Sequence, residues 1–164
     1  IRSAEEKCRV KYELREQKQF GGATLCKKLK DGEYRFPFVI YRENARNGSN
    51  ISMANEGFEH PCILSIKDGV GMLRLKAAEV TANSAATGKT MHGHVSKLKY
   101  FDRGSYISAD KNGNVLSIPA SVLSFKNIGE GIGQILHGLV CLRMQCTVGI
   151  VHMPESTAIF TILI

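Results

Sequence analysis

Hydrophobic and polar residues alternate along much of this chain, which is the pattern of half-buried β-strands. The fullest pattern covers residues 104–139. Residues 105–109 and 115–118 predict two strands joined by a turn, because Asn112-Gly113 can adopt the positive φ of a tight hairpin. From Pro119 to Leu139 apolar residues recur at three- and four-residue spacing, which predicts a helix.

Further strands are predicted along the rest of the chain. Residues 8–15 alternate strictly, after a start at Ser3 and Glu6 that resembles a helix capping box. Pro37 cannot donate to a ladder, so the strand at 34–41 should lie at an edge or carry a bulge. Residues 62–67 and 72–76 predict a hairpin, and 76–83 one or two helical turns; the other expected strands are 24–30, 94–100, 141–151 and 157–164. The fold class is therefore α+β, mostly antiparallel sheet, with one clear helix near 119–139.

The length of 164 residues predicts a single domain, 1–164. A weak internal repeat aligns residues 71–78 with 114–121. If it is real, it divides the domain into two similar β-rich halves, about 34–90 and 91–140, followed by a strand pair at 141–164. Chance similarity between two hairpins is the alternative.

Composition limits the classes of protein to which the chain could belong. The formal net charge of +7 favours a polyanionic partner, most often nucleic acid. No run of 18 apolar residues occurs, so no membrane partner is expected. Five cysteines without a C-x-x-C pair predict reduced thiols in an intracellular compartment. Because the chain starts at Ile1, a targeting segment for the mitochondrion or nucleus could have been removed.

Motifs for catalysis, cofactors or metals are weak. Residues 87–90 resemble the end of a phosphate-binding loop, but Asn83 stands where that loop needs glycine. Glycines at 129, 131 and 133 lack dinucleotide-fingerprint spacing and instead suggest close packing. His92 and His94 would share a face of a strand and could ligate a metal, although exposed loop histidines are the simpler interpretation. The sequence therefore predicts no enzyme, no cofactor and no metal.

Basic residues interleaved with aromatic ones provide the remaining signal. Aromatic rings stack on unpaired bases while Lys and Arg hold the phosphates. The predicted nucleic-acid-binding residues are Lys97, Lys99, Tyr100, Arg103 and Tyr106, joined by Arg35 and Arg74. Alternation suggests that Tyr100 and Tyr106 share a face.

Residues 112–121, with the sequence NGNVLSIPAS, form a Gly-containing turn and a strand that runs through Pro into the predicted helix. This pattern resembles the repeat of single-stranded nucleic-acid-binding proteins of the PUR-alpha and Whirly type. Residues 92–95 and the basic strand after them are similar to the second half of Whirly-like guide-RNA-binding proteins. The resemblance implies two sheets packed crosswise, helices behind them, and tetramers.

The predicted function is non-enzymatic binding of single-stranded nucleic acid, RNA more than DNA, by a subunit of an oligomer or ribonucleoprotein. The alternative is a small viral coat subunit of the jelly-roll type, or another structural assembly subunit. Self-association or a larger assembly is expected in either case, because glycines permit close helix approach and the apolar C-terminal strand needs a cover.

Overall fold

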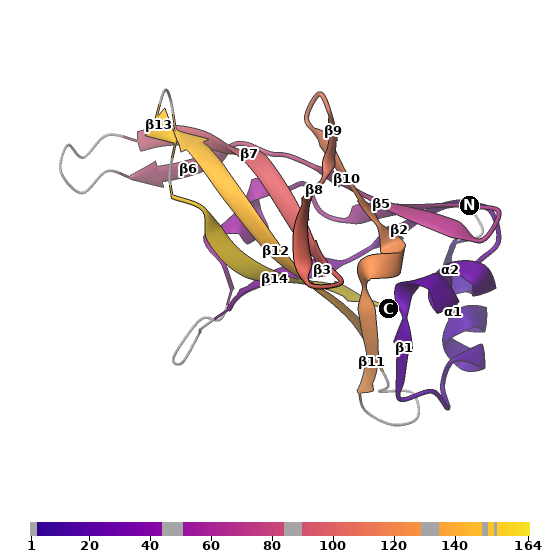
Figure 1. Cartoon of the computed structure of the whole chain (residues 1–164). Coiled ribbons are helices and arrows are strands. Elements are labelled where there is room, and N and C mark those ends of the chain that lie inside the picture. Colours follow the sequence, from indigo (N-terminus) through magenta and orange to yellow (C-terminus); the bar gives the residue numbers. More distant parts are fainter. Residues whose placement is uncertain (1–2, 44–50, 84–89, 129–134, 149–150, 153) are drawn as a thin grey trace.

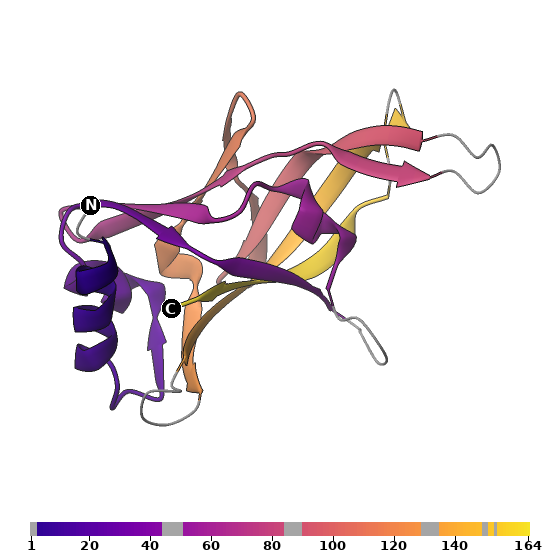
Figure 2. The ribbon, with the colours of Figure 1, turned by 180° about the vertical axis from the view of Figure 1, so that it is seen from behind.

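A computed structural model describes residues 3–43, 51–83, 90–128, 135–148, 151–152 and 154–164. Two antiparallel sheets enclose one apolar core, so the chain is mostly β-sheet with a small helical part, as the sequence predicts (Figure 1). The helices lie at one end, and the tips of β6, β7 and β13 lie at the other (Figures 1 and 2). None of the described helices has the length and apolar character needed to cross a membrane.

The larger sheet is built around the long strand β12 (Ile135–Val148). One path runs β1 (Gln19–Gly21), β11 (Ser124–Ile128), β12, β14 (Ser156–Leu163) and β3 (Phe38–Arg42). The strand β7 (Thr90–Asp102) also pairs with β12, and carries β6 (Val80–Asn83) and β8 (Ser105–Ser108); β13 (Val151–His152) pairs with the end of β12.

The smaller sheet runs in the order β2 (Gly32–Phe36), β4 (Cys62–Lys67), β5 (Val70–Lys76), β10 (Val115–Pro119) and β9 (Asp110–Asn112). The β4–β5 hairpin confirms the prediction for 62–67 and 72–76, and Asp68 and Gly69 make its turn at positive φ. The two segments of the suspected repeat lie in β5 and β10, which pair antiparallel. The structure does not confirm two similar halves.

Pro37 marks the point where the chain leaves one sheet and enters the other. The sequence predicts one strand at 34–41, but β2 ends at Phe36 and β3 begins at Phe38. Because proline has no N–H, it interrupts the ladder, while its carbonyl still accepts a bond from Leu163 N at 3.0 Å. Phe36 and Phe38 are both buried in the shared core.

The first predicted strand, 8–15, is wrong: residues 8–13 belong to the helix α1 (Ser3–Glu13), and a turn follows it. Glu6, Val10 and Leu14 are buried at four-residue spacing, which is one face of a helix. Arg9 pairs with Glu6 and Glu13 three and four residues away, which supports the helix further. The helix α2 (Gly22–Lys28) likewise replaces most of the strand predicted at 24–30, and β6 replaces the helical turns predicted at 76–83.

The helix predicted near 119–139 is also wrong. The segment holds the end of β10, the short 3-10 helix η2 (Ala120–Val122), β11 and the start of β12. Phe125 of β11 and Leu136 of β12 point into the core from two paired strands. Helical spacing in the sequence therefore came from two strands with opposite directions. The three glycines at 129, 131 and 133 lie outside the described residues.

The unit predicted at 105–118 forms differently. The strand β8 pairs with β7 in the larger sheet and not with β10, whose partner in this unit is β9. The predicted turn at Asn112-Gly113 is confirmed, because Gly113 has φ +64 between β9 and β10. The chain thus crosses from one sheet to the other at Ala109. A second 3-10 helix, η1 (Met53–Gly57), follows β3 in the chain.

Acid should selectively weaken the attachment of α1. Glu6 accepts bonds from the Arg9 guanidinium and Lys30 N–H, which hold its pKa at about 2, below the ordinary value of 4.5. Since the folded pKa is lowered, the stabilisation is present above about pH 4.5 and is lost as the pH falls toward 2. Urea unfolding of Glu6→Gln should therefore differ from the wild type at neutral pH and converge with it in acid. The control is Glu5→Gln, at an exposed position; a constant difference for Glu6→Gln would contradict the expectation.

Candidate functional site

The edge of β7 is paired at both of its ends and open in the middle. The strand β6 pairs with residues 90–93 and β8 with residues 99–102 on this edge. Among the described strands none pairs with residues 94–98 there, although a backbone bond from Ala109 N to Leu98 O, at 2.9 Å, crosses the gap. A β-bulge opposite Gln145 and Cys146 further distorts the strand. The larger sheet is therefore interrupted beside the β9–β10 hairpin.

Two hollows of about 350 Å³ each adjoin this interruption. Both are lined by Lys111 of β9 and Leu116 of β10. The first hollow extends along residues 92–95 of β7 and over Ala77, Ala78 and Asn114, and the second along residues 96–99 to Ser108 and Ala109. We call the two hollows together the β7 groove.

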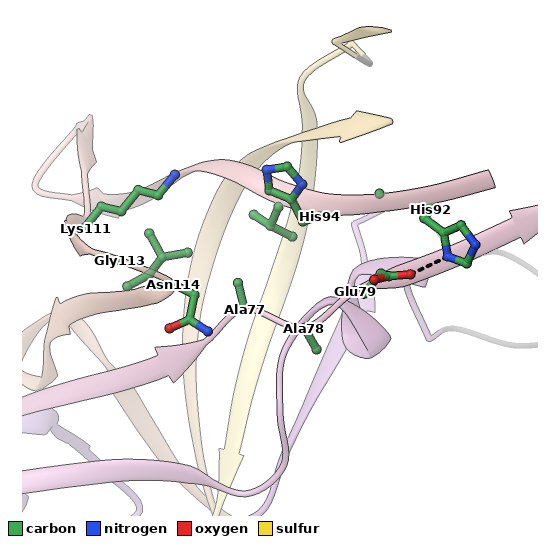
Figure 3. A pocket seen from close by; sticks show the side chains of 11 residues that line it. Ala77, Ala78, Glu79, His92, His94, Lys111, Gly113 and Asn114 are labelled. Atoms are coloured by element: carbon green, nitrogen blue, oxygen red, sulfur yellow. Dashed lines mark ion pairs between the residues drawn. The ribbon is translucent and has the colours of Figure 1, made fainter. Parts of the chain in front are cut away.

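Lys111 occupies the centre of the β7 groove. Its side chain reaches from the β9–β10 hairpin toward β7 (Figure 3) and its Nζ lies 3.4 Å from Ser96 O, on the open edge. Within the described part of the chain, no carboxylate pairs with Lys111, His94 or Lys97.

Acidic groups stand at the two ends of the groove, and each already has a basic partner. Glu79 pairs with His92 at the far end of the first hollow (Figure 3). Glu155 lies 3.6 Å from Lys99 Nζ and 4.0 Å from Arg143 Nε at the end of the second. The groove is therefore positive in its middle and neutralised at its ends. This arrangement favours an anion.

Two hydroxyl groups beside the groove, of Ser96 and Thr147, hydrogen-bond to each other and to neighbouring groups of the protein. Thr147 Oγ1 donates to Ser96 Oγ at 2.8 Å, and Ser96 Oγ donates to Gln145 O at 3.0 Å. Thr147 Oγ1 also lies 3.0 Å from His152 Nδ1. The Ser96 proton thus points to a backbone carbonyl rather than to a base. A nucleophilic serine needs the opposite arrangement, in which a base accepts its proton.

Four thiols are held in the neutral form by burial. Desolvation raises the pKa of Cys26 to about 11 and of Cys62 to about 12. Burial also raises the pKa of Cys141 and of Cys146. All five cysteines are free thiols. In the part of the chain that is described, no three His, Cys, Asp or Glu side chains gather as metal ligands would, and the histidine pair at 92 and 94 remains two residues of one strand.

The predicted site residues on β7 and β8 come together only in part. Lys97 and Lys99 line the second hollow. Tyr100 is 8% exposed and pairs with Ile107, whereas Tyr106 pairs with Phe101. The two tyrosines therefore lie on opposite faces of the sheet, contrary to the prediction, since β8 turns back on β7. Arg143 covers the Tyr106 ring at 4.1 Å.

The predicted arginines lie elsewhere. Arg103 is at positive φ in the β7–β8 turn, with its Nε 3.5 Å from Asp102. Arg35 and Arg74 belong to β2 and β5 of the smaller sheet, and Arg74 pairs with Glu33. The groove residues that the sequence interpretation missed are Lys111 and Asn114, and it considered His94 only as a metal ligand. Lys111 and Asn114 belong to the hairpin of β9 and β10. The sequence does not show which strand this hairpin faces, because that depends on where the chain crosses between the two sheets. The phosphate-loop resemblance at 87–90 lies almost entirely outside the described residues.

No family model and no curated protein matches the chain. Among solved structures it is similar to the NEAT5 domain of IsdX2, a B. anthracis hemophore, in complex with heme. That match has 16% identity and a TM-score of 0.45, and covers 81% of this chain and 96% of the other. A mutant of the same domain with heme matches at 16% identity and a TM-score of 0.46, over 82% and 96%.

These findings correct the function expected from the sequence. The similar structures are domains of a hemophore in complex with heme. The prediction of a single-stranded nucleic-acid partner is contradicted by this finding, and the similar structures support neither the coat alternative nor the expected assembly. The structure adds a physical reason, because Tyr100 is buried and the Tyr106 ring is already covered by a guanidinium.

Proposed function

We propose that this chain is a non-catalytic binding domain whose β7 groove takes a small amphipathic anion. The observation that carries the proposal is Lys111, an ammonium group between two hollows that has no carboxylate partner among the described residues. Ligand sites commonly combine an apolar lining with a few well-placed polar groups. The groove has this composition.

The apolar part of the ligand would rest on the floor of the groove. The half-buried Ala77 and Ala78 line the first hollow and Ala109 lines the second, over the buried side chains of Val95, Leu98 and Leu116. These side chains belong to both sheets, so the floor is part of the rigid core. The ligand head group would bind the Lys111 ammonium and reach the Asn114 amide, which lines the same hollow.

Binding without catalysis is favoured by the groups that surround the groove. Ser96 donates its proton to the carbonyl of Gln145. The next residue on β12 is Cys146, and burial raises the pKa of its thiol. A nucleophile in either place would first have to lose its proton to a base. The charged groups that remain can attract and orient an anion.

Removing the central charge should weaken binding. Nonanoate serves as the probe, because it joins one carboxylate to an apolar chain. Lys111→Gln should raise the Kd for nonanoate about tenfold, as expected when a hydrogen bond to a charged group is lost. Lys67→Gln is the matched control, since Lys67 is an exposed lysine at the end of β4, outside the groove. Isothermal titration calorimetry measures both.

A comparison of acetate with nonanoate tests how much the apolar chain contributes to the affinity. Acetate carries the same head group without the chain and should bind more than about tenfold weaker than nonanoate. Equal affinity for the two anions, or equal loss in Lys111→Gln and Lys67→Gln, would contradict the proposal. Heme also joins carboxylates to an apolar body and is bound in both similar structures. Likeness at 16% identity does not transfer that ligand, so hemin enters only as a larger probe of the class.

A further inference from the structure

Ser96 is the extra residue of the β-bulge in β7. The residues on either side of it, at 95 and 97, pair with consecutive residues of β12, so Ser96 has no opposite residue on that strand. Its hydroxyl donates to Gln145 O on β12 at 3.0 Å. Its carbonyl oxygen lies at the open edge of β7, where Lys111 Nζ approaches it. The bulge, a feature that is frequent beside functional sites, therefore presents a backbone acceptor to the groove.

Lys111 Nζ and Ser96 O form a donor and an acceptor that stand 3.4 Å apart. This distance is longer than that of an ordinary N–H···O bond. The contact saturates neither group, because an ammonium has three donors and a carbonyl oxygen has two lone pairs. A ligand can therefore bind both groups at once and leave Lys111 in its place beside β7.

We infer that the groove prefers an α-amido carboxylate, in which an amide N–H stands one carbon away from the carboxylate. The inference rests on the proposed function, since the carboxylate is the head group that binds Lys111 there. The carboxylate accepts from the Lys111 ammonium, and the adjacent N–H donates to Ser96 O. Acylated amino acids and the carboxyl ends of peptides share this chemistry.

The spacing of the two ligand groups matches that of the two protein groups. In an acylated glycine the amide nitrogen and the carboxylate carbon are joined through one Cα, which places them about 2.5 Å apart by standard bond lengths and angles. The carboxylate oxygens lie slightly farther from the nitrogen, close to the 3.4 Å between Lys111 Nζ and Ser96 O. Two hydrogen bonds of opposite direction can then form side by side.

The acyl chain of such a ligand provides the apolar part. Ala77 and Ala78 offer methyl groups in the first hollow, and Ala109 offers one in the second. A ligand without the N–H would make the same apolar contacts and the same bond to the ammonium. It would leave Ser96 O with only its long bond to Lys111. The amide N–H is therefore the group by which the groove distinguishes two anions of equal length.

Three ligands of equal chain length isolate the N–H by isothermal titration calorimetry. N-hexanoylglycine has it one carbon from the carboxylate, and hexanoyloxyacetate replaces it by an ester oxygen. N-pentanoyl-β-alanine, an isomer of N-hexanoylglycine, moves it one carbon farther away. N-hexanoylglycine should bind about two- to tenfold tighter than the ester, as expected for one hydrogen bond between neutral groups. It should also bind tighter than its isomer.

Lys111→Gln separates the two contributions. It should weaken binding of all three ligands about tenfold and keep the preference for N-hexanoylglycine over the ester, because the acceptor at Ser96 belongs to the backbone. Lys67→Gln, outside the groove, should change neither quantity. Carbonyl ¹³C shifts of the labelled chain locate the bond, since N-hexanoylglycine should move the Ser96 signal farther downfield than the ester does.

An acetylated dialanylglycine distinguishes the two sources of this chemistry. It should bind more weakly than N-hexanoylglycine, because it replaces the apolar chain by polar peptide groups; the reverse order would assign the site to the carboxyl end of a peptide.

The inference is overturned if the ester or the isomer binds as tightly as N-hexanoylglycine, or if the Ser96 carbonyl signal responds equally to the amide and the ester. Binding of nonanoate in that case would leave the proposed function standing. Failure of every anion to bind, nonanoate included, would remove both.

Discussion

Replacing Phe160 by alanine should lower the free energy of unfolding by about 3–5 kcal/mol, as for other large-to-small changes in a core. Phe160 lies on β14, between β12 and β3, and is 0% exposed. Its ring centroid lies 5.1 Å from that of Phe38, which itself stacks on His60 at 3.9 Å. The substitution would leave a cavity where the neighbouring strands cannot close up, and urea denaturation measures the loss.

Phe101→Ala is the matched control for this change. Phe101 is 41% exposed on β7 and makes an edge contact with Tyr106 at 5.3 Å between ring centroids. Its loss should cost about 1 kcal/mol or less. Similar costs for the two phenylalanines would mean that β14 does not lie in the centre of the core.

Gly22→Ala should destabilise the fold by about 3 kcal/mol or more, at the upper end of the cost of overpacking. A Cβ added at Gly22 would stand 1.8 Å from the Ala120 carbonyl oxygen, which belongs to the backbone and cannot rotate away. Gly22 N also donates to Leu123 O at 2.7 Å, so moving α2 away would break this bond. Helix propensity alone would favour alanine by about 1 kcal/mol, which makes the sign of the result informative.

A substitution at the neighbouring glycine shows whether the loss of stability comes from close packing or from reduced backbone flexibility. Gly21 has φ −87, which any residue can adopt, and nothing lies within 4 Å of the position that an added methyl group would take. Gly21→Ala should therefore change stability by less than about 1 kcal/mol. Thermal unfolding followed by circular dichroism compares the two variants. Equal effects would show that α2 does not rest on η2.

Local patterns predicted the strands that have one buried face. The β4–β5 hairpin, the C-terminal strands and the positive φ of Gly113 follow directly from alternation and turn residues. The segment from Pro119 to Leu139 was wrongly predicted as a helix. Phe125 and Leu136 face the same core from different strands, and their spacing in the sequence resembles that of a helix. In α1, strict alternation at 8–15 outweighed the four-residue spacing of Glu6, Val10 and Leu14.

The candidate groove was only partly predictable. Lys97 and Lys99 stood out because they are basic residues of an alternating strand, but the predicted partner, nucleic acid, was wrong. Lys111 looked like part of a turn. Its position opposite β7 depends on the crossing of the chain between the two sheets at Ala109, which brings β9 beside an unpaired strand edge. Sequence spacing contains no direct signal for such a long-range contact.

The central claim is that an amphipathic anion binds in the β7 groove. Chemical-shift mapping of the ¹⁵N-labelled chain during a nonanoate titration tests it most directly. The account predicts saturable shifts of the amides of Val95, Ser96 and Lys97 on β7 and of Gly113 and Asn114 in the facing hairpin, with much smaller shifts in Lys111→Gln. Shifts confined to other surfaces, or no saturable shift at all, would contradict it.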